Sequence, residues 1–126
     1  MLKAYDLAPI LLLGQIVLLV IHQIDSYRER EWEMPPLNLL RMTSRGFVLG
    51  TVVLVALALA CLGLLLARPA TRSAVVITWG VVGFVVPAFH TYHYLRGDRR
   101  FRRFSSIAVV YLTGLVSFPL IIAGVD

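Results

Sequence analysis

Four long apolar runs dominate the chain, and short polar segments separate them. They cover residues 7–24, 47–67, 74–95 and 107–125, and none of them contains Lys, Arg, Asp or Glu. About 20 mostly apolar residues are enough for a helix to cross the hydrocarbon core of a bilayer. Since a charge at the centre of such a span is costly, an uncharged run of this length is typical of one. The pattern therefore predicts four transmembrane helices.

The residues between the apolar runs are typical of turns and helix ends. Pro35-Pro36 interrupts the first connection, because proline cannot donate a helical hydrogen bond. Arg68-Pro69 closes the second helix, and Arg96-Gly97-Asp98 is a predicted turn after the third. The second connection is short enough to make its two helices antiparallel. We therefore expect a single all-α domain over residues 1–126, an integral membrane bundle of four helices in up-down order.

Composition excludes the other common classes of small protein. The chain has 126 residues, of which 59% are hydrophobic and only 15% charged, against about 25% charged in a typical soluble domain. A soluble domain this small could not bury so much apolar surface. Disorder needs the opposite composition, and the single Cys61 excludes a disulfide framework. The net charge of +5 is better explained by membrane orientation than by nucleic acid, because the cations flank apolar spans.

The distribution of cations predicts the orientation in the membrane. Nine of the twelve Lys and Arg residues lie in the first and third connections: Arg28, Arg30, Arg41, Arg45, Arg96, Arg99, Arg100, Arg102 and Arg103. The other three are Lys3, Arg68 and Arg72. The positive-inside rule places the two arginine-rich loops in the cytoplasm. We therefore expect a multi-pass protein of the inner (plasma) membrane with both termini outside, on the periplasmic side.

Ionisable residues cluster at one end of the predicted bundle. His22 and Asp25 are three residues apart at the end of the first span, as are His90 and His93 at the end of the third, and Glu31 lies in the first loop. Spans 1 and 3 run parallel in an up-down bundle, so both pairs should reach the same depth. Imidazole and carboxylate groups on facing helices are how metal sites are built in bundles. We therefore predict these five residues as ligands of Zn, Fe or Mn, which such donors suit better than Mg or Ca.

The same cluster also fits two roles without a metal. The histidines and carboxylates could form a structural network of hydrogen bonds at the helix ends, where histidine also complements the helix dipole. They could instead bind a lipid headgroup or another small molecule. The basic run Arg99-Arg100-Phe101-Arg102-Arg103 is expected to meet anionic lipid headgroups, because it adjoins a span.

Short motifs at both ends of the chain resemble a bacterial family of small integral membrane proteins of unknown function. The first motif consists of His22, Asp25, Ser26, Arg28, Arg30, Glu31 and Trp32, followed by Pro35 or Pro36. The second consists of His90, His93, Phe104, Ser105 and a closing Asp126. The resemblance implies a four-helix protein but no reaction. Members commonly carry Glu where this chain has Gln23, which favours Asp25 and Glu31 as ligands. A looser similarity, at the level of fold, is to small four-helix membrane families regarded as lipid- or sterol-active.

Two classes of function follow from these observations. The first is a metal-binding membrane protein with its site at the cytoplasmic interface. If it is an enzyme, the metal would activate water or oxygen against an apolar substrate from the bilayer. The second is a non-catalytic subunit that packs against a larger membrane complex, or against further copies of itself. Lipid-facing and protein-facing apolar surfaces have similar compositions, so composition does not separate the two classes.

Overall fold

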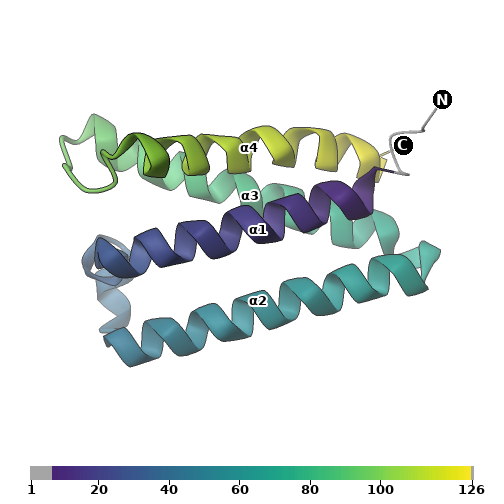
Figure 1. Cartoon of the computed structure of the whole chain (residues 1–126), viewed down its shortest axis with the longest axis horizontal. Helices are drawn as coiled ribbons and strands as arrows, with labels where there is room; N and C mark the ends of the chain where they lie inside the picture. Colours follow the sequence, from purple (N-terminus) through teal and green to yellow (C-terminus); the bar gives the residue numbers. More distant parts are fainter. Residues whose placement is uncertain (1–6, 126) are drawn as a thin grey trace.

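The computed structural model describes residues 7–125, and these form four long helices (Figure 1). Short 3₁₀ turns lie in the first two connections, and an irregular loop joins the last two helices. The long helices are α1 (Ala8–Arg28), α2 (Ser44–Ala67), α3 (Arg72–Leu95) and α4 (Phe104–Val125). The turns are η2 (Glu31–Glu33), η3 (Leu37–Leu40) and η4 (Pro69–Thr71). Lys3 and Asp126 lie outside the described residues.

All four helices are long and apolar enough to cross a membrane, which confirms the predicted all-α four-helix fold and makes this a multi-pass membrane protein. Successive helices run in opposite directions, so the start of α1 and the end of α4 lie at the same end of the bundle (Figure 1). Each helix extends past its predicted apolar run at one end. The additional turns carry polar residues, which a helix can accommodate where it leaves the hydrocarbon core.

Helices α1, α3 and α4 form the packed centre of the bundle, whereas α2 lies at its edge against α1 (Figure 1). Small residues bring α3 and α4 close together, as is usual between membrane helices. A Cβ atom on Gly124 would lie 2.7 Å from Cγ1 of Ile77, and one on Gly114 would lie 3.0 Å from Cγ of Pro87. The only buried residues of α2 are Ala58 and Leu65. Leu54, Cys61 and Leu62 are partly buried against the core, and most of its other apolar side chains face outward, where lipid covers them.

A polar cluster lies inside the bundle at the level of Gln15. The amide of this residue donates to the backbone oxygen of Trp79 at 2.7 Å and to the hydroxyl of Ser117 at 3.1 Å. Ser117 in turn donates to the backbone oxygen of Thr113 at 2.6 Å. These bonds tie α1, α3 and α4 together where water is absent, so each one satisfies a group that would be costly to leave unpaired.

Two loop conformations direct the chain back over one end of the bundle. After α1, Arg30 adopts the left-handed conformation (φ 55°), and η2 then folds back against the helix end. Trp32 holds this turn by packing on the rings of Tyr27 and Phe47. After α3, Gly97 is left-handed (φ 84°), and the amide of Asp98 donates to the backbone oxygen of His93. This is the expected turn, with the hydrogen bonds of a Schellman motif.

Candidate metal centre

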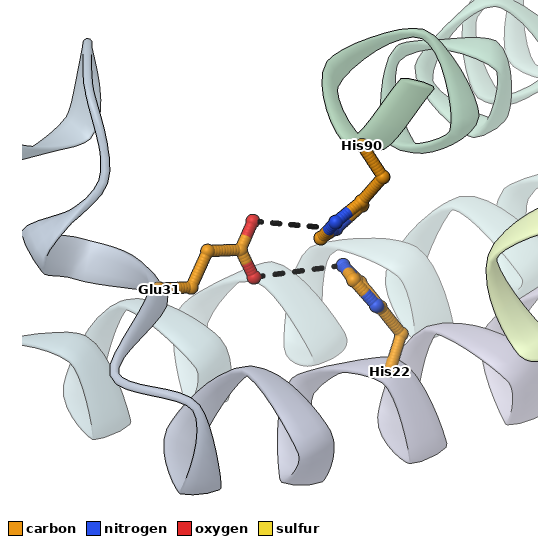
Figure 2. Close-up of side chains that lie close together, drawn as sticks. All are labelled: His22, Glu31 and His90. Atoms are coloured by element: carbon orange, nitrogen blue, oxygen red, sulfur yellow. Dashed lines mark ion pairs between the residues drawn. The ribbon is translucent and has the colours of Figure 1, made fainter. Parts of the chain in front are cut away.

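Three side chains from three separate elements converge at the end of the bundle where η2 folds back. They are His22 of α1, Glu31 of η2 and His90 of α3 (Figure 2). One carboxylate oxygen of Glu31 lies 3.7 Å from Nε2 of His22, and the other lies 3.7 Å from Nε2 of His90. The two imidazole rings meet edge to face, with their centroids 5.0 Å apart. Spans 1 and 3 therefore bring these two histidines to one depth.

All three side chains are almost fully enclosed by protein. The exposed fraction is 3% for His22, 7% for Glu31 and 0% for His90. Phe101, from the loop between α3 and α4, covers the cluster. Its ring centroid lies 4.4 Å from that of His90 and 6.0 Å from that of His22. Phe101 is itself buried, and it holds a left-handed backbone conformation (φ 58°) that is costly for a bulky residue.

The enclosed polar atoms are incompletely paired. Among residues 7–125, neither ring nitrogen of His90 has a hydrogen-bond partner. A buried polar atom is normally hydrogen-bonded, and an exception calls for a physical cause such as a missing ion. The separation of 3.7 Å from Glu31 is too long for a hydrogen bond. Two ligand atoms that each lie about 2 Å from one metal can be separated by this distance. The three residues could therefore hold a metal ion.

The environment of Glu31 affects its protonation. Burial raises the pKa of its carboxyl group above the ordinary value, and a hydrogen bond from Ser26 lowers it in part. The Ser26 hydroxyl also lies 3.4 Å from Nε2 of His22. Ser26 was not among the sequence-predicted site residues, although it lies one turn after His22 on the same helix face. Phe101 was also missed as a site residue, and nothing in its sequence neighbourhood indicates that it covers the histidines.

The other two residues predicted as ligands lie beside the cluster and contact different groups. Asp25 accepts a hydrogen bond from the hydroxyl of Ser106 at 2.9 Å. His93 uses Nε2 to donate to the backbone oxygen of Pro35 at 2.7 Å. Its Nδ1 lies 3.8 Å from a carboxylate oxygen of Asp98. The Asp25 contact joins α1 to α4, and the Pro35 contact of His93 joins α3 to the first loop. Of the five predicted ligands, His22, Glu31 and His90 therefore face one point.

The chemical character of the cluster follows from its donors. Two imidazoles and one carboxylate are the ligand set of many zinc and non-haem iron sites in which the protein leaves coordination positions free. Fold and cluster together define a four-helix membrane protein with an enclosed His/Glu group.

The chain belongs to a family of unknown function, DUF6713, whose model matches residues 8–126. This confirms the expected membership of a family without an assigned function. No match was found among the curated proteins or the solved structures.

Proposed function

We propose that this protein is an integral membrane metalloprotein whose site lies at the cytoplasmic interface and uses His22, Glu31 and His90. The observation that carries the proposal is His90, which is fully buried, has both ring nitrogens unpaired among the described residues and lies 3.7 Å from a carboxylate oxygen. A hydrogen-bonded network would be expected to pair such a group. Of the transition metals, Zn, Fe and Mn suit these donors.

The ligand count supports a reactive role for the metal. Three protein ligands leave at least one coordination position for water or substrate, whereas structural zinc sites normally use four. His22, Glu31 and His90 would hold the metal, and its chemistry there would be the activation of water near neutral pH. Because α1 and α3 are membrane spans, a lipophilic molecule is the class of substrate we propose, and it would have to displace Phe101 to reach the enclosed ligands.

The metal proposal is tested directly on the wild-type chain. The protein would be purified in a mild detergent with metal-free buffers, stripped with a chelator and reloaded separately with Zn, Fe(II) or Mn. We expect about one equivalent of one of these metals per chain after desalting, as for a site of this donor set. Elemental analysis by mass spectrometry gives the ratio, with a chelator-treated sample as the blank. A ratio no higher than the blank for all three metals contradicts the proposal.

The proposed orientation gives a second prediction. Reporter fusions after Asp126 and near Pro69 should report the outside, and fusions near Pro36 and Gly97 should report the cytoplasm. The reason is the excess of arginine in the first and third connections. Paired alkaline phosphatase and fluorescent-protein reporters at each position provide the measurement. A cytoplasmic signal after Asp126 would reverse the orientation and move the metal site to the outer interface.

A further inference from the structure

A long apolar groove lies on the outer face between α3 and α4, away from the metal centre. Its volume is about 930 Å³, which is in the range of pockets that hold a small organic ligand. Helix α3 contributes Phe84, Ala88 and Tyr92, and helix α4 contributes Leu115 and Phe118. The groove lies within two membrane spans, so the surrounding medium is lipid acyl chain. None of His22, Glu31 and His90 lines it.

The side-chain polar groups of the groove wall already have hydrogen-bond partners. The hydroxyl groups of Thr91 and Tyr111 lie 2.9 Å apart and form one hydrogen bond across the two helices. The wall therefore presents little besides carbon to an occupant. An alkyl chain fits this surface better than a polar molecule, because a polar molecule would lose its hydration without gaining partners.

One end of the groove meets a polar hollow at the end of α3. Tyr92 lines both the groove and this hollow, whose volume is about 410 Å³ and whose other walls include Arg96 and Asp98. Nη1 of Arg96 donates to the hydroxyl of Tyr92 at 2.9 Å, and the guanidinium group lies 5.4 Å from the tyrosine ring centroid. A tyrosine and an arginine at a span end are characteristic of the headgroup level of a bilayer.

The loop that begins at the hollow is rich in positive charge. Four further arginines follow Arg96 in the loop: Arg99, Arg100, Arg102 and Arg103. The acid in this loop is Asp98, and its carboxylate accepts from the backbone amide of Arg100 and faces His93. The hollow itself is lined by Arg96 and Asp98, and none of the other four arginines lines the hollow or the groove. Arg96 is therefore the cation placed where the apolar groove ends, and the others add positive charge along the same loop. Anionic lipid headgroups are attracted to such clusters.

We propose that this groove binds one anionic phospholipid. One acyl chain lies along Ala88 and Leu115, and the phosphate lies against the guanidinium group of Arg96, within reach of the Tyr92 hydroxyl. The site is separate from the proposed metal centre and does not depend on it. The apolar groove and the arginine-bearing end match two parts of such a lipid, its acyl chain and its phosphate.

The test compares phosphatidylglycerol with phosphatidylcholine. Purified protein would be equilibrated with equal amounts of the two lipids in mixed micelles, freed of loose lipid by detergent exchange and analysed by native mass spectrometry. We expect about one retained phosphatidylglycerol per chain, at least fivefold over phosphatidylcholine. Glycerophosphoglycerol, the headgroup without chains, should not displace it, because the groove holds the chain. Equal retention of both lipids, or displacement by the bare headgroup, would overturn the proposal.

Two variants, each with a matched control, test which residues bind the phosphate and which bind the acyl chain. Arg96→Gln should bring the ratio of retained phosphatidylglycerol to phosphatidylcholine close to one. Arg103→Gln, in the same loop but outside the groove, should leave this ratio at the wild-type value. Ala88→Leu fills the groove and should lower retention of both lipids at least fivefold, whereas Ala60→Leu, also on an outward face, should not. Circular dichroism and gel filtration verify folding of each variant. If Arg103→Gln abolishes the preference as fully as Arg96→Gln, or if Ala88→Leu retains lipid, the assigned site is wrong.

Discussion

Replacing His90 by glutamine is expected to lower the metal bound per chain at least about tenfold, since even loss of a group that supports a ligand costs 10- to 100-fold in affinity. The substitution keeps a polar side chain of similar size but replaces an imidazole by an amide, which is a much poorer metal donor. Only His22 and Glu31 would then remain. Metal per chain would be measured after chelation and reloading, at matched helical content and monodispersity. A hydrogen-bonded network, in contrast, should tolerate the amide.

The matched control is the other histidine of the same pair. His93 donates to the backbone oxygen of Pro35, a bond that glutamine can also make, so His93→Gln should retain metal at the wild-type level. Asp25→Asn should also retain it. If these two variants lose as much metal as His90→Gln, all five sequence-predicted residues take part in binding. If wild type carries no more metal than His90→Gln, the cluster is structural, and the accessory-subunit interpretation takes its place.

The pH dependence of metal binding has a definite sign. A metal binds the deprotonated carboxylate of Glu31, and protons compete with it. Burial raises the pKa of this carboxyl group, so protonation of the metal-free site begins at a higher pH than for an exposed glutamate. Metal affinity should therefore fall as the pH is lowered toward that pKa. In the Glu31→Gln variant, the residual weak binding should lose this part of the pH dependence.

The positions of the four helices could be predicted from the sequence because lipid imposes a simple requirement on it. Every backbone polar group in the hydrocarbon core must be paired within the protein, and a single uncharged apolar run of about 20 residues achieves this by forming a helix. The edge position of α2 could not be predicted in the same way. All four spans are apolar over most of their circumference, and packing then depends on where small residues such as Gly124 allow close approach.

The candidate site could be predicted to the level of the helix end but not of the single side chain. Residues three apart on a helix differ in direction by about 60°, since three steps cover most of a turn. His90 therefore points into the bundle, while His93 points toward the first loop. The sequence spacing is the same whichever member of the pair points inward. The contribution of Glu31 depends on the left-handed conformation of Arg30, for which an arginine gives no signal.

Substitution of Gly83 by alanine is expected to destabilise the bundle by about 2–4 kcal/mol, the range for overpacking combined with the loss of interhelical hydrogen bonds in a membrane protein. A Cβ atom at this position would overlap the amide nitrogen of Gln15 and the hydroxyl oxygen of Ser117. Gln15 cannot move aside freely, because its amide is bonded to the backbone oxygen of Trp79 and to Ser117. Moving it would leave polar groups unpaired where no water can replace the lost partners.

The matched control for Gly83→Ala is Gly50→Ala on α2, where an added Cβ atom would meet nothing within 4 Å. Unfolding of both variants by denaturing detergent, followed by circular dichroism, compares their stabilities. Gly50→Ala should be neutral or slightly stabilising, because alanine has the higher helix propensity.

A second substitution separates steric overlap from a general effect of the methyl group. Gln15→Ala removes the side chain that the new Cβ atom would meet, so the cost of Gly83→Ala should be smaller in that background. Equal costs in both backgrounds would show that Gln15 is not what keeps residue 83 a glycine.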